Sequence, residues 1–231
     1  KESSAASDVY KRQDMQTKIV ILDFDGTLGD TRMNIVKTLQ QTLAHCSLPV
    51  AGETECAATI GIPLFDAFLQ LVPTLTKEQA QECVDIYRDI FEVNKKKLMP
   101  KPFPHVLDTM RSLASRGVIL TIASSRSNTS LHGFVEEMGM EPYVKYVIGA
   151  EDVVNAKPQP EPVLKTLSHF GLSAADALVV GDMHYDILMG KNAGARTCGV
   201  TYGNATRRQL ADSGATYIID DFAQLLDIVC Q

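Results

Sequence analysis

Short apolar runs rich in β-branched residues recur along this chain, separated by stretches in which apolar residues have helical spacing. Six such runs occupy residues 18–22, 118–123, 146–148, 177–180, 196–201 and 217–219. Between them, apolar residues fall at i, i+3, i+4 and i+7, as in the set Leu131, Phe134, Val135 and Met138. Strands that alternate with helices of about 10–15 residues are typical of βαβ units. The pattern therefore predicts an α/β fold built on a parallel sheet.

Residues 31–103 interrupt this alternation. Apolar residues keep helical spacing there, in the sets Val36, Leu39 and Leu43, then Phe65, Phe68, Leu69 and Val72, then Val84, Tyr87 and Phe91. The block ends in the segment 99–104, MPKPFP, where three prolines stop a helix and stiffen the chain. A chain of 231 residues has room for one large domain or for one domain with an insertion. We expect a core formed by residues 15–30 and 104–231, split by a helical insertion at residues 31–103.

The first 14 residues are polar and lack the apolar segment of a signal peptide. Met15 stands just before the first strand-like run and looks like the natural start of the protein. We therefore expect residues 1–14 to be a non-native or disordered leader that is extraneous to the fold.

Composition narrows the class of protein. A hydrophobic share of 45% and a charged share of 22% are ordinary for a soluble globular domain. The net charge of −6 disfavours binding to nucleic acids or to anionic membranes, which needs a basic face. No apolar run approaches the ~20 residues of a membrane span.

The five cysteines are odd in number and widely spaced, with no C-x-x-C pair: Cys46, Cys56, Cys83, Cys198 and Cys230. Structural zinc sites and disulfide frameworks need closer, paired spacing. Reduced thiols in a cytoplasmic protein are the plain interpretation.

Acidic residues follow two of the predicted strands. Asp23 and Asp25 come directly after the first strand, and residues i and i+2 of a strand point to the same side. Asp182 comes just after the run 177–180. If a helix begins there, Asp186 lies one helical turn further on. A polar turn would by itself explain Asp25 and the glycine after it. Four carboxylates at two strand ends, however, would repel one another without a cation, and hard oxygen ligands favour Mg²⁺.

Three further candidates lie after other strands. Ser124 and Ser125 follow the run 118–123, at the expected start of a helix whose amides attract anions. Lys157 lies in a loop and is followed by a proline that stiffens its backbone. A helix cap is the usual role of such a serine, and most loop lysines are solvated. Together with Mg²⁺, however, Lys157 would balance three ionised carboxylates, and the site would then suit a phosphate group.

These residues resemble the four ordered motifs of the haloacid dehalogenase superfamily. The motifs are DFDGTL at 23–28, Ser124, Lys157 with its proline, and the segment 181–186 with the pattern GDxxxD. The resemblance runs from about Met15 to the C-terminus. It implies a Rossmann-like core with an inserted α-helical cap, and within the superfamily the likeness is to phosphoglycolate phosphatase-like members, pyrophosphatases included.

The resemblance also implies roles. Asp23 would be the nucleophile that forms an aspartyl-phosphate, and Asp25 would be the general acid and base. The Mg²⁺ ligands would be Asp23, the backbone carbonyl of Asp25, Asp182 and Asp186, the last either directly or by orienting a ligand. Ser124, Ser125 and Lys157 would bind the substrate phosphate, and the cap would close over it. The partner implied is a small phosphorylated metabolite, acted on by a monomer or homodimer.

Other chemistries in the superfamily remain to be weighed. Haloacid dehalogenases and phosphonate-cleaving relatives lack the acid at position 25, which is present here. A β-phosphoglucomutase-like phosphomutase is the alternative to a hydrolase, although the cap segment 61–65, GIPLF, lacks the arginine that such mutases commonly carry. A non-catalytic phosphate-binding protein would not need Asp25. Arg32, Lys37 and Arg88 could contact an anion, but surface charge is the plainer interpretation, and His105, where many relatives have glycine, receives no role.

Overall fold

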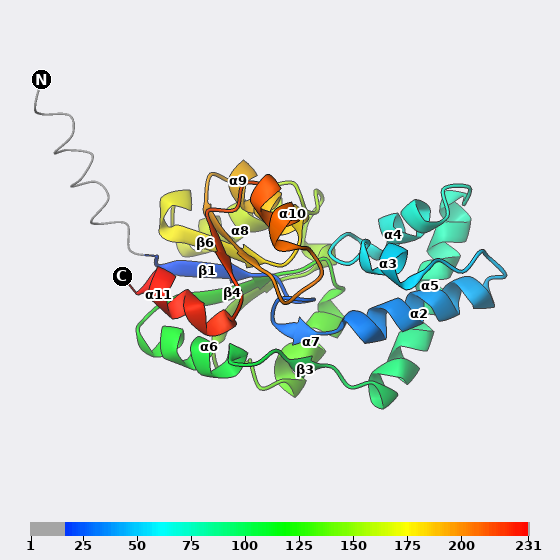
Figure 1. Ribbon diagram of the computed structural model, residues 1–231, viewed down its shortest axis with the longest axis horizontal. Helices are drawn as coiled ribbons and strands as arrows, with labels where there is room; N and C mark the ends of the chain where they lie inside the picture. The colour runs from blue at the N-terminus through cyan, green and yellow to red at the C-terminus, as the bar shows by residue number, and fades with distance from the viewer. Residues whose placement is uncertain (1–16, 231) are drawn as a thin grey trace, which may run out of the picture.

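A six-stranded parallel sheet forms the centre of the computed structural model, which describes residues 17–230 (Figure 1). The strand order is β5-β4-β1-β6-β7-β8. The strands are β1 (Ile19–Leu22), β4 (Ile119–Ala123), β5 (Val144–Ile148), β6 (Ala177–Gly181), β7 (Arg196–Val200) and β8 (Tyr217–Ile219). Each of the six predicted runs overlaps one of these strands, so the predicted α/β fold with a parallel sheet is confirmed. The predicted leader, residues 1–14, lies outside the described residues.

Strand β1 lies at the centre of the sheet and is buried on both faces. Its register pairs Ile19 with Ile119 of β4 on one side and with Ala177 of β6 on the other. Val20 and Leu22 join the large hydrophobic cluster on one face, whereas Ile19 and Ile21 join the smaller cluster on the other. The period-2 alternation of a strand thus explains why this segment is apolar throughout.

Helices cover both faces of the sheet (Figure 1). One cluster includes residues of α6 (Val106–Ser115), α7 (Asn128–Glu137) and α11 (Leu225–Val229). The other includes residues of α8 (Glu161–Phe170) and α9 (His184–Asn192), and α10 (Arg207–Asp212) packs beside α9. Residues 17–230 also contain three short 3₁₀ helices: η1 (Ala150–Asp152), η2 (Ala174–Asp176) and η3 (Phe222–Gln224).

Four helices lie between β2 (Gly29–Asp30) and β3 (Lys101–Pro102) in sequence and extend beyond one end of the sheet (Figure 1). They are α2 (Arg32–His45), α3 (Glu53–Ala57), α4 (Leu64–Leu71) and α5 (Lys77–Lys97). The longest, α5, begins at a capping box in which the Thr76 hydroxyl accepts from the backbone N–H of Gln79. Helix α2 packs against α5, which buries the apolar faces that the sequence pattern marked.

Two very short strands connect this helical segment to the core. β2 (Gly29–Asp30) pairs antiparallel with β3 (Lys101–Pro102). The proline-rich segment was expected to be only a stiff linker, because a two-residue strand leaves no periodicity in the sequence. Next to it, His105 adopts a left-handed conformation with φ of 63°, and its Nδ1 lies 2.7 Å from Oδ2 of Asp221. His105 is thus attached to the core.

Aromatic rings link the core to the helical segment. The ring of Phe24, next to Asp23, lies 5.7 Å from that of Phe134 in α7, and Phe134 meets Phe91 of α5 edge-on at 6.1 Å. Tyr87 stacks on Phe91 at 5.8 Å. Such pairs each contribute about 0.5–1.5 kcal/mol beyond the area that they bury. Within the described residues, no helix is both long and apolar enough to span a membrane.

Candidate active site

Asp23 lies at the carboxyl end of β1 and is almost completely buried. Its backbone N–H continues the sheet by donating to the carbonyl of Val180, at 2.8 Å, and its Oδ1 accepts from Nζ of Lys157 at 2.5 Å. Burial raises the pKa of Asp23 well above its usual value, as do Asp186 and Asp182, whereas Lys157 opposes this rise. The carboxylate therefore depends on a cation for its charge.

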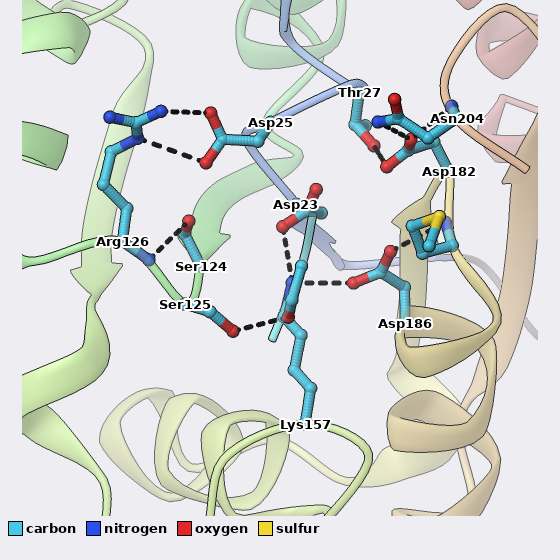
Figure 2. Close-up of polar contacts among 12 residues, drawn as sticks. Asp23, Asp25, Thr27, Ser124, Ser125, Arg126, Lys157, Asp182, Asp186 and Asn204 are labelled. Atoms are coloured by element: carbon cyan, nitrogen blue, oxygen red, sulfur yellow. Dashed lines mark hydrogen bonds and ion pairs between the residues drawn. The ribbon is translucent and has the colours of Figure 1, made fainter. Parts of the chain in front are cut away.

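Asp25 points in a different direction from Asp23 (Figure 2). Its Oδ1 accepts from the hydroxyl of Thr31 at 2.7 Å, and its Oδ2 accepts from Nε of Arg126 at 3.1 Å. The period-2 argument predicted that Asp23 and Asp25 would converge. Both side chains line the same cavity, but β1 ends at Leu22 and the chain then turns, with Gly26 at a φ of 87°, and the two carboxylates bind different partners.

Asp182 and Asp186 approach Asp23 from β6 and α9. Oδ2 of Asp182 accepts from the backbone N–H and from Nδ2 of Asn204, at 2.7 and 2.8 Å, and Oδ1 accepts from the hydroxyl of Thr27 at 3.3 Å. Helix α9 begins two residues after Asp182, as the spacing requires, and Asp186 in its first turn accepts from the N–H of Met183 at 3.0 Å.

Glycine at position 181 makes this approach possible. A Cβ at Gly181 would lie only 2.2 Å from Cβ of Asp186. Any larger residue at this position would therefore displace the Asp186 carboxylate.

Asp23, Asp182 and Asp186 form a group that fits a divalent cation. One oxygen of each lies within 4.8 Å of the others, and all three side chains are buried. Burial and the neighbouring Asp186 carboxylate raise the pKa of Asp182 to about 7. Buried carboxylates that repel one another in this way are stabilised by a cation, and an all-oxygen ligand set suits Mg²⁺. The carboxylate of Asp25 lies outside this group.

Lys157 joins two of the acids. Its Nζ lies 2.5 Å from Oδ1 of Asp23 and 2.6 Å from Oδ1 of Asp186, and its side chain is only 2% exposed. Burial by itself would lower the pKa of Lys157, but the Asp186 and Asp23 carboxylates outweigh it and the pKa is raised. Lys157 is thus a buried cation held against the Asp23 carboxylate.

Ser124 and Ser125 lie in the turn before α7 and not at its start. The helix begins at Asn128, because the chain first forms a serine-rich turn. Oγ of Ser124 accepts from the N–H of Arg126 at 3.2 Å, and the Ser125 hydroxyl donates to the carbonyl of Gly61 at 2.7 Å. Ser125 thus connects the core to the helical segment, whereas buried Ser124 lines the site.

Arg126 is the main site residue that sequence reasoning missed. Its guanidinium binds both oxygens of Asp25, and its side chain is 9% exposed. Its Cζ lies 4.8 Å from the ring centre of Phe134 and 5.1 Å from that of Phe91, within range of a cation–π interaction. An arginine in a serine-rich loop has the same sequence signal as a solvated one, so only the fold distinguishes it. Thr27, Thr31 and Asn204 were missed for the same reason.

A cavity of about 610 Å³ opens between these residues and the helical segment. Asp23, Asp25, Ser124 and Arg126 lie on its core side, and residues of α2, α4 and α5 line the opposite side. Of the three cations considered from sequence, Arg88 lines this cavity and Lys37 is exposed. Arg32 binds Oδ1 of Asn204 at 3.3 Å instead.

Comparison with known proteins identifies relatives over nearly the whole chain. Residues 20–200 match the family model described as haloacid dehalogenase-like hydrolase. The chain is 34% identical to "Probable phosphatase IndB" of Dickeya dadantii, covering 90% of this chain and 91% of that protein. It is 33% identical to pyrophosphatase PpaX of Bacillus pumilus, covering 91% and 95%.

The fold has solved counterparts as well. A structure from Haemophilus somnus, titled as a predicted phosphoglycolate phosphatase, superposes with a TM-score of 0.82 at 24% identity and covers 92% of this chain and 98% of that one. This likeness concerns the fold, with its parallel sheet and flanking helices.

Proposed function

This chain belongs to the haloacid dehalogenase-like hydrolase family, and from its site we propose that it is a phosphatase that hydrolyses a small phosphorylated metabolite through a phosphorylated Asp23. The observation that carries the proposal is the placement of Asp23. Its buried carboxylate touches Lys157, stands among two further acids, and faces the cavity.

Asp23 is the proposed nucleophile. Oδ1 is held by Lys157, and no hydrogen bond to Oδ2 is found within residues 17–230, which leaves that oxygen available for attack on phosphorus. The new bond from Asp23 to phosphorus forms as the bond to the leaving oxygen breaks. Water then attacks phosphorus, releases inorganic phosphate and restores the carboxylate. Two such steps are easier than one direct hydrolysis.

Asp25 is the proposed general acid and base. It would donate a proton to the leaving oxygen in the first step and take one from the attacking water in the second. Arg126 and Thr31 hold its carboxylate at the cavity wall. We propose that Arg126 is a positioning residue, because its guanidinium binds both oxygens of Asp25.

The phosphate group would bind between Lys157, the Ser124 hydroxyl and the acid group. We propose that Asp23, Asp182 and Asp186, with the backbone carbonyl of Asp25, hold Mg²⁺. A cation bound there neutralises carboxylates and withdraws charge from the phosphate oxygens. Lys157, which contacts Asp23 and Asp186, would supply a second positive charge, and Ser124 would supply a neutral donor.

We also propose that residues 31–103 act as a cap over this site, which excludes water and contacts the leaving group. Ser125 supports this view, since its bond to Gly61 joins the phosphate-binding turn to that segment. The cytoplasmic location and the monomeric or dimeric state stay predictions from the sequence.

The test is release of inorganic phosphate from a panel of monoesters and pyrophosphate in the presence of Mg²⁺. We expect hydrolysis by the wild-type protein and none by Asp23→Asn. Isomerised sugar phosphate in place of free phosphate would favour the phosphomutase alternative. Equal phosphate release by both proteins would contradict the role of Asp23.

A further inference from the structure

On the premise of the phosphatase function, we propose that the substrate of this enzyme is a monoester whose leaving group is bulky, ring-containing and uncharged. Such a substrate differs from pyrophosphate and 2-phosphoglycolate, whose leaving groups are small anions. The inference rests on the size of the cavity, on the apolar character of its cap side, and on the charges that face it.

The cavity is too large for a two-carbon acid or a single phosphate. Its volume of about 610 Å³ falls within the ~300–1,000 Å³ of pockets that enclose drug-sized ligands. The phosphate site at Asp23 and Lys157 occupies one end, so the rest of the volume is left for the leaving group.

The wall opposite the acids is mainly apolar. It is formed by residues of α2, α4, α5 and the loop before α4, among them Ile35, Ile62, Leu64, Phe65, Tyr87 and Phe91. Phe65, Ile62 and Leu64 are only partly buried within the protein, so a ligand could still cover them. Covering apolar surface stabilises a complex by roughly 25 cal/mol per Å². A ring with apolar faces gains from this wall, and a small anion does not.

The charged groups around the leaving-group end disfavour an anion. Arg126 is paired with Asp25 and therefore carries no free positive charge. The remaining charged residues that line the cavity within residues 17–230 are Arg88, Glu92 and Glu151. They sum to one negative charge, and Arg88 lies 3.6 Å from Asp85 as well. A second phosphate or a carboxylate would meet one arginine and two carboxylates in this region, so no net positive charge favours its binding there.

Neutral hydrogen-bonding groups complete the wall. Gln81, Ser127 and Thr129 line the cavity and carry no charge. Amides and hydroxyls of this kind suit the hydroxyl or carbonyl groups of a sugar or a nucleobase. The relative named as a pyrophosphatase shares 33% identity with this chain, and the walls that face a leaving group come from a different segment than the acids do. Membership of the family therefore does not determine which leaving group this chain accepts.

The first experiment compares kcat/KM for five substrates. Benzyl phosphate and uridine 5′-monophosphate carry uncharged rings, 2-phosphoglycolate and pyrophosphate carry anionic leaving groups, and glycerol 3-phosphate is the small uncharged reference. We expect both ring esters to exceed both anionic substrates by at least about tenfold, the scale on which apolar pockets discriminate. Activity on pyrophosphate or 2-phosphoglycolate that equals or exceeds activity on the ring esters would overturn the inference and leave the phosphatase function intact. Hydrolysis of none of the five would overturn both.

The second experiment changes the wall. Phe65→Ala is expected to lower kcat/KM for benzyl phosphate about tenfold and to change that for glycerol 3-phosphate less than about twofold. Ile62→Lys is expected to favour 2-phosphoglycolate over benzyl phosphate relative to the wild type. Val50→Ala, an exposed apolar position outside the cavity, is the matched control and should change neither ratio. If Phe65→Ala lowered kcat/KM equally for every substrate, with its melting temperature unchanged, this wall would not discriminate between leaving groups.

Discussion

The ammonium of Lys157 lies between the carboxylates of Asp23 and Asp186, so the two acids share the same cation. Removing the charge of Asp23 therefore leaves Lys157 paired with Asp186. It also removes one of several buried negative charges that repel one another. The negative charge of Asp23 is therefore expected to add little to the stability of the fold.

Asp23→Asn should consequently separate activity from folding. We expect kcat to fall by at least about 10⁴-fold, the loss typical of a removed nucleophile. The melting temperature should stay the same or rise. Phosphate release and a thermal melt on the same sample measure the two effects. Appreciable residual turnover, or a marked loss of stability, would contradict this account of Asp23.

Arg126 presents the opposite case, because its charge is buried and paired with one acid. Arg126→Gln leaves Asp25 without its cation and removes the guanidinium from the rings of Phe91 and Phe134. Breaking a buried ion pair costs about 3–5 kcal/mol. We expect urea denaturation to show a loss of that size.

The kinetics of Arg126 variants should identify its role. If Arg126 only positions Asp25, then kcat falls, whereas KM for a phosphate ester with an uncharged leaving group changes little. Arg126→Lys keeps the charge but loses the planar fork, so it should restore stability more than kcat. A large rise in KM with unchanged kcat would instead indicate direct contact with the substrate.

Among single residues, the sequence predicted those site residues whose chemical type and whose position relative to a strand both pointed to a site. Asp23 and Asp182 directly follow strands, Asp186 lies in the first turn of α9 and Lys157 lies in a loop. The structure brings the four together. The direction of Asp25 could not be predicted, because it depends on where β1 stops and on a partner 101 residues away.

Among the elements, helix α9 shows how closely the site is packed against the sheet. A Cβ on Gly190 would lie 2.5 Å from Cγ2 of Thr197 and 2.9 Å from Cβ of Val179. Helix α9 therefore approaches β6 and β7 at a distance that only glycine allows, and this approach carries Asp186 to its place.

Gly190→Ala should destabilise the protein by about 1–3 kcal/mol, as overpacking does. The matched control is Gly133→Ala in α7, where the new Cβ would meet only Nζ of Lys95 at 3.7 Å. In the control, alanine should stabilise the helix by roughly 0.5–1 kcal/mol. Urea denaturation of both variants measures the difference, and equal effects would show that the α9 contact is not tight.

Helices and strands could be predicted from the sequence where they are long enough for their apolar residues to show a regular spacing. All six strands of the parallel sheet were found, since each is three to five residues long and contains apolar residues that the sheet buries. Strands β2 and β3 were missed because each has two residues. The start of α7 was predicted too early, because the serines that precede it resemble helix caps in the sequence.

For the molecule as a whole, the net charge of −6 includes the buried acid group, which costs folding free energy until a cation binds. Saturating Mg²⁺ should therefore raise the melting temperature, since a ligand at 100 times its Kd stabilises the folded state by about 2.7 kcal/mol. A chelator should reverse the shift. Asp182→Asn is the control and should lose most of it. The same shift in wild type and variant would mean that Mg²⁺ acts elsewhere.

The charged groups of the site, Asp23, Asp25, Arg126, Lys157, Asp182 and Asp186, all lie outside residues 32–97. The two halves of the cavity are therefore encoded by separate stretches of sequence, so a lineage could replace the inserted helices and acquire a new substrate without rebuilding the reactive centre. The same separation would let a protein engineer graft a foreign insertion between β2 and β3. The contacts that such a graft would have to reproduce include the packing of Phe91 against Arg126 and the hydrogen bond from Ser125 to Gly61.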